Sequence, residues 1–367
     1  MKRIDALTGI RGLAALWVAL FHLHISDSGT WLHLGPVAAH GAWGVDIFFI
    51  LSGMILSLVY CPKMPSTISR RWFGRFLLRR IAKIYPLHLL TLLATIGLVV
   101  LAASRHYQFH AINTEYTAWS AIANLFLLHA LGVTRQLSWN TASWSVSAEW
   151  FAYLVLFVPM VTLLRRVRLA WVIGLALSMW VGLVLLAEFG LHTPIAELSY
   201  RGVLRIVPEF LCGYALYRIL EVAKPRRGDI FWMIGIAGIV CLCFFSGLTI
   251  LLAPCIGLVL LGLYWGGPLA DAVWGNRLAV RIGEASFSIY MQQEFFQIVF
   301  NQAVRRVVIP HTVIAAIALV TLYIVLVCVA GVLCFLYIEE PLRQAIIRRF
   351  DPHSRPAAYT QVAATVA

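Results

Sequence analysis

An arginine and a histidine stand at the two ends of an apolar segment near the start of the chain, RGLAALWVALFH at residues 11–22. Arg11 and His22 are eleven residues apart, which in an α-helix is about 16 Å of rise and within about 20° of the same face. A guanidinium binds phosphates, and an imidazole accepts protons near neutral pH. The pair therefore predicts an anion site and a general base on one helix face. The alternatives are an arginine that reaches the lipid headgroups and a histidine bonded to a backbone carbonyl.

Two carboxylates lie within later apolar segments. Asp46 falls in the first turn of GVDIFFILSGMIL, at about the depth of His22, where a carboxylate orients an imidazole. Glu149, in WNTASWSVSAEWFAYL, lies about 15 Å into its segment, with Tyr153 one turn further. A carboxyl group at that depth is a functional candidate. We therefore predict His22, Asp46 and Glu149 as catalytic residues; the alternatives are a helix N-terminal charge at Asp46 and a structural ion pair at Glu149.

A basic run precedes the third apolar segment, with the sequence SRRWFGRFLLRRIAKIYP at residues 69–86. Its aromatic and aliphatic residues alternate with cations in an amphipathic pattern. One interpretation is an interfacial helix on anionic lipid. The other is a binding site for the phosphates of a nucleotide-like cofactor, formed by Arg75, Arg79, Arg80 and Lys83.

Three further residues are candidates for the site or for its support. Arg205 and Glu209 are four residues apart within an apolar segment, so they are predicted either to pair with each other or to contribute to the site. Ser52 precedes Gly53, and two such small residues let helices approach closely.

The elements that carry these residues are predicted to be membrane-spanning helices. Of 367 residues, 61% are hydrophobic and only 12% are charged, about half the charged fraction of soluble domains. Apolar runs of about 17–25 residues recur, and each can cross the hydrocarbon core as a helix. The sequence therefore predicts an all-α, polytopic membrane protein and excludes a soluble enzyme with a single core. We predict ten crossings, near 7–25, 44–61, 85–103, 139–164, 169–188, 201–220, 230–246, 249–266, 284–303 and 312–337.

The distribution of charge predicts the orientation. With both termini inside, the predicted inner segments hold 21 of the 29 Lys and Arg residues, as the positive-inside rule requires. The net charge of +13 therefore needs no nucleic-acid partner. The segment 117–131 is too short to cross, so we predict a re-entrant or interfacial helix on the outer side, and a basic amphipathic helix in the inner loop 62–84. We expect one domain over residues 1–350 and a disordered tail over 351–367. The seven cysteines have no metal-binding spacing, and we expect no metal.

Seven motifs in order resemble the membrane-bound acyltransferase 3 family, bacterial integral membrane enzymes that O-acetylate polysaccharides and related acceptors. They extend over the chain up to the tail. They are R-x10-H at 11–22, GVDIFFILSG at 44–53, FLLRRIAKIYP at 76–86, WSVSAEWFAY at 144–153, LRIVPEFLCG at 204–213, IGEASFSIYM at 282–291 and IEEPLR at 338–343.

The resemblance implies a transfer across the bacterial inner membrane, from a cytoplasmic acyl-CoA, usually acetyl-CoA, to a hydroxyl of a carbohydrate or glycolipid. It implies functional roles for Arg11, His22, Glu149 and the basic element near residue 80. The sequence departs from the family at two positions. Lys83 replaces an arginine, which keeps the charge and loses bidentate phosphate binding. Gln293 stands where a histidine is frequent, which suggests a variation on the acceptor side.

Two other classes of function compete with an enzyme. A transporter of a small anion or lipid-linked sugar would line its path with Arg11, Glu149 and Arg205, but such proteins usually contain internal repeats, and we find none. A non-catalytic scaffold of the same fold is expected to lack the pair of Arg11 and His22, which this chain has.

Overall fold

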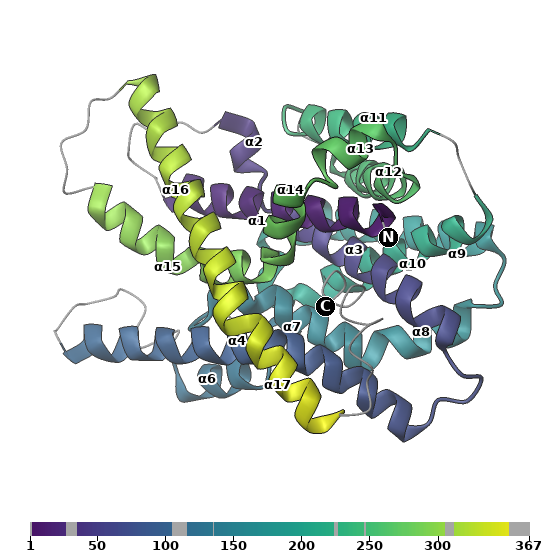
Figure 1. Ribbon diagram of the computed structural model, residues 1–367, viewed down its shortest axis with the longest axis horizontal. Coiled ribbons are helices and arrows are strands. Elements are labelled where there is room, and N and C mark those ends of the chain that lie inside the picture. The colour runs from purple at the N-terminus through teal and green to yellow at the C-terminus, as the bar shows by residue number, and fades with distance from the viewer. Residues whose placement is uncertain are drawn as a thin grey trace.

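The computed structural model describes residues 2–26, 35–104, 116–134, 136–223, 227–245, 247–304 and 312–351. These residues form helices and, within the described ranges, no strand, which confirms the all-α prediction. The helices are α1 Lys2–Ser26, α2 Gly35–Ala39, α3 Trp43–Tyr60, α4 Arg70–Ser104, α6 Ala118–Leu125, α7 Trp144–Phe151, α8 Phe157–Leu164, α9 Leu169–Leu185, α10 Gly202–Val222, α11 Gly228–Leu242, α12 Leu252–Trp265, α13 Pro268–Val273, α14 Arg277–Glu284, α15 Ser286–Val304, α16 Val313–Cys334 and α17 Glu340–Phe350 (Figure 1).

Within the described ranges, six helical segments are long and apolar enough to cross a membrane. They are Asp5–Leu23, Trp43–Lys63, Arg70–Leu101, Thr141–Leu164, Leu169–Gly190 and Val313–Phe350. Two shorter apolar helices, Gly228–Leu242 and Thr249–Trp265, coincide with two more of the predicted crossings. The two crossings that remain, 201–220 and 284–303, coincide with α10 and α15. Every predicted crossing is therefore helical. The count of ten and the orientation stay predictions.

The basic run and the third predicted crossing form one helix rather than two elements. α4 has 35 residues and continues through Pro86, so it is about 52 Å long. The cations of residues 70–83 are thus rigidly joined to the apolar segment that follows. The short outer segment is α-helical only over Ala118–Leu125 and has a 3-10 turn at His129–Leu131, as expected for a piece that does not cross; its position relative to a membrane stays a prediction. Apart from Asp351, the predicted disordered tail lies outside the described residues.

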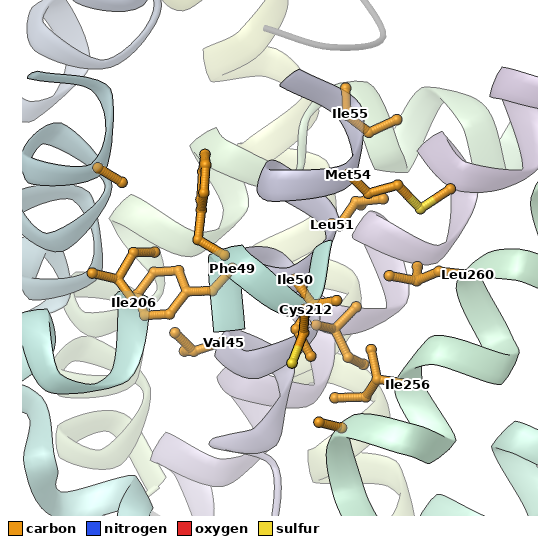
Figure 2. Packing of buried hydrophobic residues seen from close by; sticks show 14 of the residues in the cluster. Val45, Phe49, Ile50, Leu51, Met54, Ile55, Ile206, Cys212, Ile256 and Leu260 are labelled. Atoms are coloured by element: carbon orange, nitrogen blue, oxygen red, sulfur yellow. The ribbon is translucent and has the colours of Figure 1, made fainter. Parts of the chain in front are cut away.

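The centre of the molecule is the packing of α3 against α10, α1 and α12. Gly53 and Gly213 lie where α3 and α10 cross, and a Cβ at either would collide with a backbone carbonyl oxygen of the other helix. Figure 2 shows the buried side chains around this crossing, with Ile50 of α3 near Cys212 of α10. The crossing at Gly53 confirms that this small residue serves close helix packing, and it fixes the position of its neighbour Ser52.

The part of the chain that the structure describes has three π-helical turns. Two interrupt helices, at Ala152–Leu156 and Phe335–Glu339, and one ends α9, at Leu186–Gly190. Such turns are frequent at functional sites because they re-aim side chains. The turn at Ala152–Leu156 contains Tyr153, and the turn at Phe335–Glu339 ends at Glu339. Both residues belong to the candidate site.

Candidate functional site

A cavity of about 90 Å³ opens among α1, α3, α4, α7 and α15, large enough for several water molecules. Its apolar wall includes aromatic residues of α3 and α15. Its polar wall gathers residues that are far apart in sequence: Arg11, Ser52, Arg80, Lys83, Ser145, Glu149, Tyr153, Ser286 and Tyr290. The structure therefore brings together six of the eleven predicted site residues.

Glu149 is held in the cavity by two hydroxyl groups. Ser52 donates to its Oε1 at 2.5 Å, and Tyr153, one turn later, donates to its Oε2 at 3.1 Å. The π turn begins immediately after α7, so the tyrosine hydroxyl reaches back to the carboxyl group. Each carboxyl oxygen thus has a neutral partner. The structure explains why Ser52 and Tyr153 matter: they orient Glu149.

Three cations lie on the same cavity. The Arg80 guanidinium lies 5.7 Å from the Tyr60 ring centroid and 5.9 Å from that of Tyr153. Arg11 interacts electrostatically with Glu149 and Arg80. Lys83 pairs with another residue, described next. Aromatic faces stabilise a buried guanidinium, and three cations contribute to the polar wall of the cavity.

Glu339 is a further site residue; the sequence shows it only as part of the IEEPLR motif at 338–343 and gives it no predicted role. Its carboxylate pairs with Lys83 at 2.5 Å and also accepts a hydrogen bond from Ser288. Both partners are buried. The pair joins α4 to the π turn that follows α16. The two residues are 256 positions apart in the sequence, so no local sequence pattern indicates their contact.

The five cations predicted to bind phosphates are divided by the structure. Arg11, Arg80 and Lys83 line the cavity, whereas Arg79 pairs with Asp351 at 3.0 Å and Arg75 lies 3.9 Å from the same carboxylate. Adjacent helix positions differ by 100°, so Arg79 and Arg80 face different directions. The carboxylate follows α17, which crosses α4 (Figure 1).

Asp46 and Arg205 belong to a second, closed cluster. Arg205 donates to Asp46 at 2.9 Å and lies 3.5 Å from Glu209, and all three side chains are fully buried. The Trp144 ring covers the guanidinium at 5.0 Å. The predicted pairing of Arg205 with Glu209 is thus confirmed. None of the three lines the cavity.

His22 lies on α1 about three turns from Arg11, beyond the residues that line the cavity. Its backbone carbonyl accepts a hydrogen bond from Gln297 at 3.0 Å, and its ring meets Phe21 edge-on. The expectation that Asp46 or Glu149 orients the imidazole is wrong for the described residues. Asp46 is bound by Arg205, and Glu149 by two hydroxyl groups, because those partners lie closer.

Two buried histidines that the sequence analysis did not single out fasten the segment before α7. His88 of α4 bonds the Asn124 carbonyl at 2.9 Å, and Asn140 reaches the other ring nitrogen at 3.1 Å. His129 lies 3.1 Å from the Ser143 hydroxyl. The His88 contacts tie Asn124 and Asn140 to α4, and the His129 contact holds Ser143, the residue before α7. Among the described residues, no three histidine, cysteine or acidic side chains gather as metal ligands.

This chain matches one family and three known relatives, two of which are acyltransferases by name. The profile of a family described as "Acyltransferase domain" matches residues 4–338. The chain is 30% identical over 181 residues to "Acyltransferase MdmB" of Streptomyces mycarofaciens and 30% identical over 190 residues to "Putative peptidoglycan O-acetyltransferase YrhL" of Bacillus subtilis (strain 168). It is 31% identical over 201 residues to "Protein 2 in picA locus" of Rhizobium radiobacter.

These similarities differ in extent. The matches cover 46%, 47% and 51% of this chain, in the same order. They cover 43% and 27% of the first two relatives, so the chain spans less than half of either, and 97% of the third. No solved structure matches the chain.

Proposed function

Because the chain belongs to this acyltransferase family, we propose that it is a multi-pass O-acyltransferase of the bacterial inner membrane. Its donor is a cytoplasmic acyl-CoA, with acetyl-CoA as the first choice. Its acceptor is a hydroxyl of a carbohydrate, such as an exopolysaccharide, an O-antigen or an oligosaccharide. One observation carries the proposal: three cations and a hydroxyl-anchored carboxylate share one cavity inside a bundle of apolar helices.

The donor site in this proposal is the cationic wall. Among the charged residues that line the cavity, Arg11, Arg80 and Lys83 outnumber Glu149, which favours an anionic ligand. Hydrogen bonds from cations to phosphate are stronger than neutral ones, and a guanidinium binds two phosphate oxygens at once. The donor's thioester would then extend along the cavity, away from the phosphates.

The chemistry is an attack of the acceptor hydroxyl oxygen on the thioester carbonyl carbon. The C–S bond breaks, an ester bond forms, and the hydroxyl proton ends on the CoA thiol. His22 is the proposed general base for the hydroxyl, or a transient acyl carrier. Glu149, fixed by Ser52 and Tyr153, is the proposed second proton-handling group at the donor end.

The test is O-acyl ester content of the envelope glycans in a strain lacking the gene and complemented with variants. General-base removal lowers rates about 10²–10⁴-fold. We expect such a loss for His22→Asn. We expect it also for Glu149→Gln, because Glu149 is the proposed second proton-handling group. Asparagine is chosen because it keeps a polar group of similar reach.

His192→Asn is the matched control, because this histidine is exposed and has a positive φ of 49°, which asparagine tolerates. It should leave the ester content at the wild-type level. Full ester content with His22→Asn would remove the proposed role of the imidazole. A wild-type chain that adds no ester would remove the proposed function itself.

A further inference from the structure

Helix α15 runs beside α1 in the same direction, at a constant offset. Just before α15, Gly283 at the end of α14 approaches the Thr8 carbonyl so closely that a Cβ there would collide with it. Further along, Ser286 and Arg11 line the same cavity, and Gln297 donates to the His22 carbonyl. Each of these three pairs differs by 275 in residue number. The interval from Ser286 to Gln297 therefore accompanies the interval from Arg11 to His22, about 16 Å in each helix.

Gln293 lies on the face of α15 that connects these two levels. At 100° per residue, Ser286, Gln293 and Gln297 fall within about 40° of one another. Gln293 is about 10 Å beyond Ser286 at the cavity and about 6 Å before Gln297 beside His22. Its position is thus between the cationic wall and the proposed base.

The Gln293 carboxamide is fully buried and has no hydrogen-bond partner for either Oε1 or Nε2 among the described residues. Only its backbone carbonyl is engaged, by the Tyr323 hydroxyl at 3.4 Å. Nearly all buried polar groups in proteins are paired, because burying an unpaired amide is unfavourable. An apolar side chain of similar size would avoid that penalty. The amide therefore points to a partner that arrives with a ligand.

We infer that Gln293 binds the acceptor, by exchanging two hydrogen bonds with hydroxyl groups next to the one that is acylated. The inference rests on the proposed function. A carboxamide offers a donor and an acceptor, and hydroxyl groups satisfy both. A thioester carbonyl only accepts and would leave Oε1 unpaired. Gln293 is thus a specificity-determining residue, and it favours acceptors that present more than one hydroxyl.

The experiment compares Gln293→Met with Gln292→Met in the complemented strain and as purified proteins. Methionine keeps the length of the side chain and removes both hydrogen-bonding groups. We expect Gln293→Met to lower glycan ester content at least about tenfold, the effect of losing hydrogen bonds to one substrate. Its midpoint of thermal unfolding should equal or exceed the wild-type value, since an unpaired buried amide is gone. The rise in that midpoint on adding acetyl-CoA should be unchanged.

Gln292 is the matched control because it is only half-buried and its Oε1 is not among the buried atoms without a partner; its Nε2 also lacks a partner among the described residues but lies against α16. A Cβ built at Gly331 of α16 would lie 3.1 Å from its Nε2. Gln292→Met should keep the wild-type ester content.

Three results would overturn the inference: wild-type ester content in Gln293→Met, a lower unfolding midpoint that marks a structural amide, or loss of the acetyl-CoA effect, which would assign the amide to the donor. If the wild-type chain itself adds no ester, the proposed function fails first, and the inference fails with it.

Discussion

The cavity beside Glu149 and the cluster around Arg205 are both groups of charged side chains within apolar helices, but their surroundings differ. In the cavity, Glu149 is held by hydroxyl groups, and its neighbouring cations border open space. In the cluster, Arg205 contacts Asp46 and Glu209 directly, and no part of the three side chains is exposed.

This difference separates a site from a support. Charged residues in membrane helices are expensive and are therefore functional candidates by default. The Arg205 cluster shows that the charge alone is insufficient evidence, because its charges neutralise one another without access for a ligand. What distinguishes the Glu149 region is free volume together with hydroxyl partners that fix the carboxyl group.

The largest expected effect comes from Arg205→Met. Removing the one cation leaves Asp46 and Glu209 as unbalanced buried carboxyl groups, which costs about 3–5 kcal/mol of stability. Thermal unfolding of the detergent-purified protein should show a large fall in the midpoint or no folded protein at all.

The control is the triple variant that also carries Asp46→Asn and Glu209→Gln. It has no unbalanced charge and should recover most of the lost stability, because replacing a whole buried ion cluster is often tolerated. If Arg205→Met alone unfolds at the wild-type midpoint, the cluster does not stabilise the fold. The proposed difference between a structural cluster and a functional cavity would then be contradicted.

A smaller effect is expected for donor binding, where two arginines five residues apart should behave differently. Arg80→Met removes a cation from the cavity wall and should weaken acetyl-CoA binding about tenfold, the loss of one charge-assisted contact. Arg75→Met should change it less than about twofold, because Arg75 is half-exposed and faces Asp351. Isothermal titration with the purified protein measures both. Equal losses of acetyl-CoA affinity in the two variants would place Arg75 in the donor site. They would contradict the assignment of Arg80 to the cavity and of Arg75 to the contact with Asp351.

Most of the fold could be predicted from the sequence because each predicted crossing is a continuous run of apolar residues of membrane length. The continuity of α4 was missed, since the run of cations at 70–83 interrupts the apolar pattern although the backbone stays helical through Pro86. Hydropathy reports the environment of a segment. It does not report whether the helix ends where the environment changes.

The site was predictable where its contacts are local or where depth alone marks a residue. Glu149 was found by its depth, and Tyr153 by its place one turn later. The contact of Ser52 with Glu149 spans 97 residues, and the pair of Lys83 with Glu339 spans 256, so no periodicity reveals either. Asp46 was assigned to His22 on depth, but depth is shared by every helix at that level, and Arg205 is the cation that α10 brings against it.

The smallest expected effect concerns a third carboxylate environment. It is a carboxylate outside both charged clusters that accepts hydrogen bonds from backbone N–H groups. Asp229 is half-buried at the start of α11, and it accepts hydrogen bonds from the Trp232 side chain and from the backbone N–H groups of Leu269 and Ala270. Partial burial raises the pKa of Asp229, but these hydrogen bonds outweigh it and bring the pKa below the ordinary 3.8. The carboxylate therefore stabilises the fold above pH 3.8, and this contribution disappears as the pH falls through the lowered pKa.

Asp229→Ala should cost about 1 kcal/mol near neutral pH, the usual effect of losing a capping side chain. The difference in unfolding midpoint from the wild type should shrink as the pH is lowered below 3.8. Asp271→Ala provides a comparison on the neighbouring α13 helix. A difference that stays constant with pH would show that Asp229 acts through its shape rather than its charge. In that case the contribution of a carboxyl group bound by neutral donors would not depend on its ionisation. The same would then apply to Glu149, which lies between two hydroxyl groups.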